Sequence, residues 1–214
     1  MKYYPAYLDL NEKKVMVIGG GKVAERKVRL LLKAGAVVTI ISPELSPGLH
    51  KLQDSGLVRY KARPYRRGDL TGVFLVIACT SSKEVNARVA AAAENLINVI
   101  DDPALGNFIV PSVVKKGPLT VAVSTEGASP AVSKAIRKEI ELMYDAEFGQ
   151  FLKFTAGLRQ EAVEQITDRK QRERFLKSLA SAGLLKILKT QGVLAAETHV
   201  LDKLNGILNK KGAR

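Results

Sequence analysis

The stretch VMVIGGGKVAERKVRLLLKAGAVVTIISP, residues 15–43, decides the fold of this chain. It begins with a short β-prone run, 15–18, and passes through consecutive glycines, Gly19 to Gly21, into a helical pattern. A second β-prone run, 36–41, follows Gly35. A strand, a glycine-rich turn, a helix and a second strand in this order predict a parallel βαβ unit.

The glycine-rich turn matches the pattern G-x-G-x-x-A that dinucleotide-binding proteins place between a strand and a helix. Gly19 permits a tight turn, and Gly21 lets the backbone approach a pyrophosphate that a Cβ atom would block. The small side chain of Ala24 allows the helix to pack closely on the sheet. Because the N–H groups of the helix N-terminus then face the diphosphate, we expect a dinucleotide to bind across Gly19 to Ala24.

The second strand lacks the acidic residue that usually binds the adenosine ribose at its end. Ser42 and Pro43 occupy that place, and Glu44 lies just beyond it. Glu44 is a candidate ribose ligand, although an exposed side chain without a role explains it equally well. Since no arginine lies between Val37 and Lys51 to receive a 2′-phosphate, the sequence favours NAD over NADP.

Further β-prone runs, at 58–62, 73–79 and 97–100, extend the pattern and predict an α/β fold with a Rossmann-type parallel sheet. Ser81 and Glu84 fit a capping box that opens a helix after the second of these runs.

Polar residues follow two of these runs, at the sheet edge where such folds bind ligands. Thr80 is a candidate cofactor contact there. Asp101 and Asp102, followed by Pro103, also fit ordinary turn chemistry. Because a carboxylate near a nicotinamide ring accepts a proton as hydride leaves, Asp101 is a candidate catalytic residue.

The second half of the chain changes from alternating strands and helices to a hairpin followed by helices alone. The β-prone runs 108–114 and 119–124 predict the hairpin, and Pro111 indicates that its first strand is an edge or is broken there. Ser129 followed by Pro130 predicts the start of a helix. The expected architecture is therefore a Rossmann-type sheet, a small α+β segment and a helical C-terminal domain.

The composition is that of an ordinary globular protein, with 46% hydrophobic and 26% charged residues in 214. The longest apolar run, 73–79, is too short to cross a membrane, and the first residues lack the apolar core of a signal peptide. A cytoplasmic location without membrane association is expected. A single cysteine, Cys79, and only two histidines argue against disulfides and against a resident metal centre.

The charge balance, 34 basic against 21 acidic residues, favours an anionic ligand, a nucleic acid or an acidic surface as partner. An alternative function is therefore an NAD(H)-sensing regulator whose helical half, 148–214, binds nucleic acid. That half carries 13 basic and 6 acidic residues, but it shows no aromatic stacking platform and no recognition-helix pattern. We expect no nucleic-acid partner. A dehydrogenase for another anionic small molecule fits the glycine loop as well.

Three segments together resemble the precorrin-2 dehydrogenase family, which forms sirohydrochlorin in siroheme synthesis. They are the stretch 15–43, the segment NVIDDP at 98–103 and the run 108–141, which contains VAVSTEGASP. The resemblance covers residues 1 to about 150 strongly and the C-terminal helices more loosely. It implies three parts: an NAD-binding Rossmann domain, 1–112, a dimerisation segment, 113–147, and a helical substrate-covering domain, 148–214.

The resemblance also implies an activity and a site. A homodimer would oxidise precorrin-2, an anionic tetrapyrrole, to sirohydrochlorin with NAD, and the insertion of Fe²⁺ into the product stays open. By position, the functional aspartate of the family falls on Asp101, and a hydroxyl-bearing turn near the substrate falls on Ser124 and Thr125. The cofactor contacts expected from the loop pattern and the family together are Gly19, Gly21, Lys22, Val23, Ala24, Pro43, Glu44 and Thr80.

Overall fold

The computed structural model describes residues 2–209. The chain divides into two compact units, Met1–Val110 and Pro111–Arg214. The finer expected division, with boundaries near residues 112 and 147, stays a prediction.

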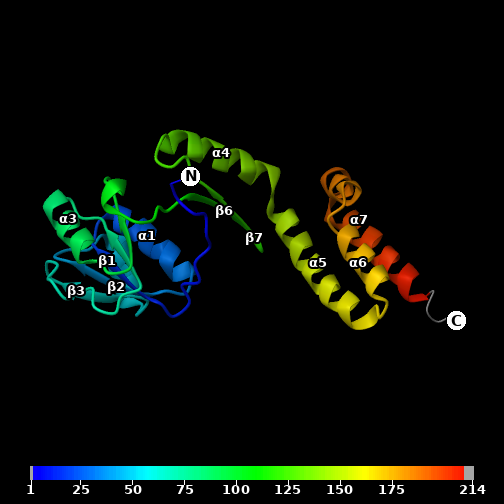
Figure 1. Cartoon of the computed structure of the whole chain (residues 1–214), viewed down its shortest axis with the longest axis horizontal. Coiled ribbons are helices and arrows are strands. Elements are labelled where there is room, and N and C mark those ends of the chain that lie inside the picture. The colour runs from blue at the N-terminus through cyan, green and yellow to red at the C-terminus, as the bar shows by residue number, and fades with distance from the viewer. Residues whose placement is uncertain (1, 210–214) are drawn as a thin grey trace. The chain divides into compact units, whose positions relative to one another are not determined.

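The first unit is built on a five-stranded sheet in the order β3-β2-β1-β4-β5. Figure 1 labels β1, β2 and β3 of this sheet. All neighbouring strands run parallel; Val15 of β1, for example, pairs with Val38 of β2 and Leu75 of β4. The strands are β1 Lys14–Ile18, β2 Val37–Ser42, β3 Arg59–Ala62, β4 Leu75–Ala78 and β5 Leu96–Val99. Because the strand order reverses at β1, ligands are expected at the carboxyl ends of β1 and β4.

Helices cover both faces of this sheet, which explains why β1 and β4 are almost continuously apolar. Val28 of α1 and Leu49 of α2 pack in one buried cluster with Val17. Val89 of α3 packs in a second cluster with Ile18, on the other face. The helices are α1 Lys22–Lys33, α2 Pro47–Asp54 and α3 Lys83–Ala92, and a 3₁₀ turn, η1, spans Pro103–Leu105.

The start of α3 differs from the prediction. Ser82, not Ser81, is the N-cap: its backbone is extended and its Oγ accepts a hydrogen bond from the N–H of Val85 at 3.2 Å. Glu84 accepts a hydrogen bond from the same Oγ at 2.7 Å, so it assists the cap without forming the expected box. The helix begins one residue later than predicted, and the Thr80 hydroxyl accepts a hydrogen bond from the N–H of the capping Ser82 at 3.2 Å.

The second unit opens with the predicted hairpin, an antiparallel pair of β6 Ser112–Lys116 and β7 Leu119–Val123. The first strand begins directly after Pro111, which has no N–H to donate to a ladder. The helix α4 Pro130–Met143 follows, capped as predicted by the Oγ of Ser129, which accepts from the N–H of Val132 at 3.3 Å.

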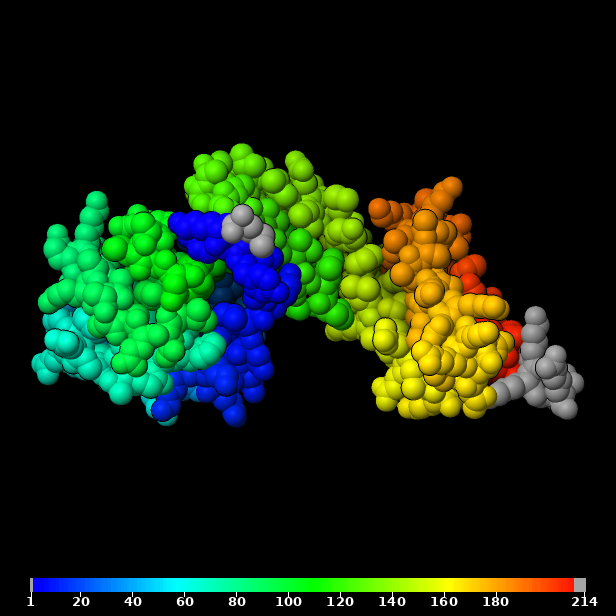
Figure 2. Space-filling model, viewed as in Figure 1, coloured from blue at the N-terminus to red at the C-terminus, as the bar shows by residue number. Residues whose placement is uncertain are grey.

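The remaining helices pack around one apolar core that includes Phe151, Phe175 and Leu184. They are α5 Ala146–Gln165, α6 Arg169–Ser178 and α7 Ala182–Asn209, drawn in yellow to red in Figure 2. Gly192, with φ 84° and ψ 178°, kinks α7. The predicted fold class, a parallel sheet followed by a small antiparallel sheet and helices, is confirmed. Within the described residues no helix is long and apolar enough to cross a membrane.

Candidate functional site

The glycine-rich loop lies where β1 ends and α1 begins, and two of its glycines are required by the fold itself. Gly19 has φ 120°, and a Cβ on it would lie 2.6 Å from the carbonyl oxygen of Cys79. A Cβ on Gly20 would collide with the carbonyl oxygen of Glu44 and lie 2.8 Å from Ser42 Oγ. The loop is therefore wedged between the segments that follow β2 and β4.

Gly21 differs from its neighbours, because a Cβ built on it meets no atom of the described residues within 4 Å. It is the N-cap of α1 and provides no side-chain acceptor for the first N–H groups of the helix. Ala24, in the first turn, is fully buried against the sheet, whereas Lys22 and Val23 are exposed at the helix start. Open space in front of uncapped N–H groups is the arrangement that accepts a diphosphate.

The segment after β2 holds the loop in place. The N–H of Ser46 donates to the carbonyl oxygen of Gly20 at 2.7 Å, and the Oγ of Ser46 donates to Glu25 of α1 at 2.7 Å. Arg29 also donates to Glu25, at 2.8 Å. The hydrogen bond from Ser46, followed by that from Arg29, lowers the pKa of Glu25, so this acid anchors the loop as a carboxylate.

Pro43 and Glu44 lie in this same segment, next to the glycine loop. The hydroxyl of Tyr60 donates to the carbonyl oxygen of Pro43 at 3.1 Å. The Glu44 side chain is exposed, while its backbone carbonyl is the group that excludes a Cβ from Gly20. Both residues therefore border the site, and the Glu44 carboxylate is accessible to a ligand.

Thr80 lies on the other side of the loop, and its own contacts involve a residue that the sequence alone did not reveal. Its N–H donates to Oδ1 of Asn86 at 3.1 Å, and Nδ2 of Asn86 donates back to its carbonyl oxygen at 3.1 Å. The Thr80 hydroxyl also donates to Asn86 Oδ1, at 2.8 Å. Asn86 is buried in α3. A polar residue at an inward-facing helical position was the available sign of this role.

Asp101 stands at the carboxyl edge of the sheet, two residues after β5 ends. The preceding residue, Ile100, donates from its N–H to the carbonyl oxygen of Ala78 at 2.9 Å, which ties the segment to the end of β4. Asp101 has φ 67°, in the left-handed region, and its side chain is exposed. Among the described residues its carboxylate has no hydrogen-bond or ion-pair partner. The neighbouring Asp102, in contrast, is occupied as the cap of η1.

Burial shifts the pKa values of two titratable groups near the loop, Cys79 and Lys27. Burial raises the pKa of the Cys79 thiol to about 12, so it stays neutral. Burial also lowers the pKa of Lys27 of α1, and the nearby charge of Arg26 acts in the same direction.

Ser124 and Thr125 lie in the second unit, between β7 and α4. The Ser124 Oγ accepts a hydrogen bond from the N–H of Glu126 at 3.1 Å. The Thr125 hydroxyl donates to the carbonyl oxygen of Ser129 at 3.0 Å and accepts from its N–H at 3.1 Å. Both hydroxyls therefore shape the turn that leads into α4.

A known protein family matches the part of the chain that contains the glycine loop. The model of a putative NAD(P)-binding family matches residues 6–112, which include the whole parallel sheet. This chain belongs to that NAD(P)-binding family. The model of the central region of sirohaem biosynthesis proteins matches residues 116–143, which contain β7 and α4.

Relatives of this NAD(P)-binding chain include siroheme synthases. Siroheme synthase 1 of Aeromonas salmonicida is 37% identical over 95% of this chain, and siroheme synthase of Methylobacillus flagellatus is 41% identical over 95%. In each case the match covers 44% of the relative, so the chain spans less than half of their length.

A solved structure titled SirC, precorrin-2 dehydrogenase, matches with a TM-score of 0.81 and 26% identity. The match covers 95% of this chain and 100% of that one. Together these matches confirm the family resemblance inferred from the three sequence segments.

Proposed function

We propose that the chain is an NAD-dependent dehydrogenase that oxidises precorrin-2 to sirohydrochlorin. The observation that carries the proposal is its likeness to the solved precorrin-2 dehydrogenase along the whole of that protein. The names of the siroheme synthase relatives support the same pathway. A cytoplasmic location is part of the proposal.

The cofactor-binding residues in this proposal are those that border the glycine loop. The N–H groups after Gly21 hold the diphosphate, Lys22 and Val23 flank it, and Ala24 keeps the helix close to the sheet. Pro43 and Glu44 border the adenosine side, and the absence of an arginine there favours NAD over NADP. Thr80 is a cofactor contact at the end of β4, and its N–H, carbonyl and hydroxyl groups are held in position by Asn86. Bound NAD⁺ supplies the hydride acceptor.

Asp101 takes the proton that the substrate releases together with the hydride. Its carboxylate is exposed and, among the described residues, unpartnered, which leaves its oxygens available as acceptors. Its position after β5 puts it on the edge of the sheet where β1 and β4 also end. The reaction is balanced, since precorrin-2 loses one hydride and one proton and yields sirohydrochlorin, NADH and H⁺.

The substrate carries many carboxylates, which the basic excess of the chain attracts. Ser124 and Thr125 are proposed to approach the tetrapyrrole from the turn before α4. Because their hydroxyls already bond to the turn, the exposed Ser124 is the one with capacity left for a ligand.

We also propose a homodimer formed through β6, β7 and α4. The two-stranded sheet leaves an open edge on each strand. Along α4, apolar side chains stay exposed: Val132 at 49%, Leu142 at 85% and Met143 at 59%. A second copy that covers this helix would bury all three.

The test is to mix purified chain with enzymatically generated precorrin-2 and NAD⁺ and to follow NADH absorbance. NADH formation with the appearance of the sirohydrochlorin spectrum is expected. Absence of NADH would overturn the proposal, and salt-sensitive DNA binding in the same preparation would favour the regulator instead. Addition of Fe²⁺ then decides on metal insertion: conversion to siroheme faster than in a protein-free control makes the enzyme bifunctional.

A further inference from the structure

A cavity of about 880 Å³ lies between the β3–β4 connection and α3. Polar residues in its lining are Tyr65, Arg66, Arg67, Arg88 and Glu94. Tyr65 packs with the cluster of apolar residues on the face of the sheet opposite α1. None of the residues expected to bind the cofactor lines this cavity.

The cavity holds an excess of positive charge that the protein does not neutralise. Three arginines, Arg66, Arg67 and Arg88, are among its lining residues, against one acid, Glu94. Within the part of the chain that the structure describes, none of these three arginine side chains forms an ion pair. Unpaired arginines that converge on one cavity are suited to phosphate or carboxylate, which the planar guanidinium binds through two parallel hydrogen bonds.

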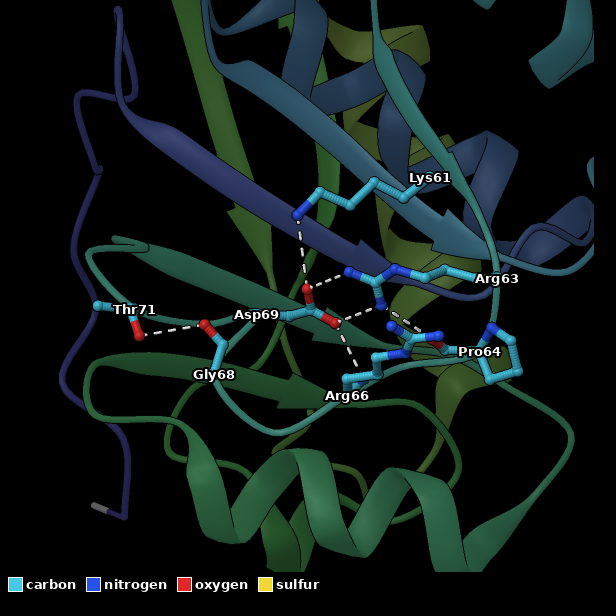
Figure 3. A network of polar contacts seen from close by, with 7 residues as sticks. All are labelled: Lys61, Arg63, Pro64, Arg66, Gly68, Asp69 and Thr71. Carbon is cyan, nitrogen blue, oxygen red and sulfur yellow. Dashed lines mark hydrogen bonds and ion pairs between the residues drawn. The ribbon is translucent and has the colours of Figure 1, made fainter.

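The acid nearest to these arginines along the connection is already saturated. Asp69 receives two hydrogen bonds from the guanidinium of Arg63, at 2.6 and 2.8 Å, and one from the N–H of Arg66 at 2.9 Å. Lys61 adds a fourth contact at 3.4 Å (Figure 3). The Asp69 carboxylate therefore holds the connection in shape and forms no ion pair with Arg66, Arg67 or Arg88 among the described residues.

Tyr65 adds an independent observation. Its hydroxyl oxygen is buried and, among the residues that the structure describes, has no hydrogen-bond partner. Burial, followed by the charge of Asp69, raises the pKa of Tyr65, and Arg88 and Arg67 oppose this shift. The hydroxyl is thus a protonated donor at neutral pH. A buried donor without an acceptor is destabilising. Because Tyr65 lines the cavity, a shift of its side chain toward a bound anion would give the hydroxyl an acceptor.

We infer that this cavity is an anion site, separate from the dinucleotide loop, for a small molecule with at least two phosphate or carboxylate groups. Arg67 and Arg88 bind the anionic groups, and the Tyr65 hydroxyl donates a hydrogen bond to one of them. Glu94 selects against molecules that carry a single negative charge, because it offsets part of the attraction.

Two probes distinguish phosphate from carboxylate as the group that binds in the cavity. Inorganic pyrophosphate and citrate are titrated separately into the full chain by calorimetry, and into the double variant Arg67→Gln/Arg88→Gln. We expect at least one probe to bind the wild-type chain, and the double variant to bind it at least about tenfold more weakly. The control Arg159→Gln/Arg174→Gln removes the same charge from exposed positions of the second unit. It should bind as the wild type does.

The comparison of the wild type with Arg67→Gln/Arg88→Gln matters because the N–H groups after Gly21 would also attract pyrophosphate. Binding that is equal in the wild type and in Arg67→Gln/Arg88→Gln would belong to the glycine loop and would overturn the inference. Failure of both probes to bind the wild type at millimolar concentration would overturn it as well.

Tyr65→Phe distinguishes a ligand role from a structural one. A hydroxyl that serves only the fold would lower the melting temperature when removed. Since this hydroxyl has no internal partner, Tyr65→Phe should keep or raise the melting temperature while it weakens binding of the probe several-fold. A lower melting temperature with unchanged binding would contradict the assignment.

Discussion

At the scale of single residues, the adjacent glycines Gly20 and Gly21 have different functions. A Cβ on Gly20 meets the Glu44 carbonyl, whereas a Cβ on Gly21 enters empty space in front of the α1 N-terminus. The packing of the protein requires a glycine at position 20, and the NAD diphosphate that we propose to bind there requires a glycine at position 21.

Alanine at each position separates these requirements. Gly20→Ala should lower the free energy of unfolding by about 1–3 kcal/mol, because the Glu44 backbone must move. Gly21→Ala should change stability by less than about 1 kcal/mol but weaken NAD⁺ binding markedly. Urea denaturation and NAD⁺ titration measure the two effects. Unchanged NAD⁺ affinity in Gly21→Ala would place the diphosphate elsewhere.

Asp101 is the second residue whose backbone and side chain are both informative. Because its φ is 67°, Asn is the suitable replacement: it tolerates the left-handed region and removes only the negative charge. Asp101→Asn should reduce NADH formation by about 10²–10⁴-fold, as expected for a lost general base, and leave NAD⁺ affinity unchanged. The matched control is Asp102→Asn, which keeps an oxygen to cap η1 and should stay active. Equal rates in all three proteins would remove Asp101 from the mechanism.

At the scale of elements, the β3–β4 connection is held by the Asp69 carboxylate. The hydrogen bond from Arg63, the largest cause, holds the pKa of Asp69 well below its usual range. A carboxylate whose pKa is lower in the folded than in the unfolded chain stabilises the fold fully above the unfolded pKa, about 4. That contribution is lost as the pH falls further toward the folded pKa.

Asp69→Asn should therefore cost about 2 kcal/mol or more at neutral pH, because it breaks the ion pairs of a nearly buried carboxylate. The variant should also show a shallower loss of stability below about pH 4 than the wild type. Urea denaturation at several pH values measures both effects. A parallel pH dependence in the two proteins would mean that Asp69 does not titrate with folding.

At the scale of the whole molecule, the exposed apolar side chains of α4 are the surface through which we propose that two copies of the chain form a dimer. Val132→Lys combined with Met143→Lys puts charge on this side without touching a buried residue. We expect the wild type to sediment as a dimer and this variant as a monomer, because lysines at a dimer interface lose their hydration. Val163→Lys is the control, since Val163 is exposed to 54% on α5. A wild-type monomer at micromolar concentration would refute the dimer.

Local sequence patterns determined several structural elements of this protein. Hydrophobic runs, glycines and proline punctuation predicted the βαβ start, the hairpin after Pro111 and the cap at Ser129, because each depends on residues close together in the chain. The glycine pattern also predicted the dinucleotide loop, and the resemblance in three segments predicted the family.

Contacts between distant segments were decided only by the tertiary structure. Nothing in the sequence indicated that the Glu44 carbonyl would close on Gly20. Two contacts within one short segment were also missed: Asn86 bonds to both backbone groups of Thr80, and Ser82 caps α3. Arg88 of α3 likewise meets Tyr65, Arg66 and Arg67 of the β3–β4 connection only in the fold. Periodicity reports which face of an element is buried, whereas partners across the sheet depend on strand order and packing, which no local pattern encodes.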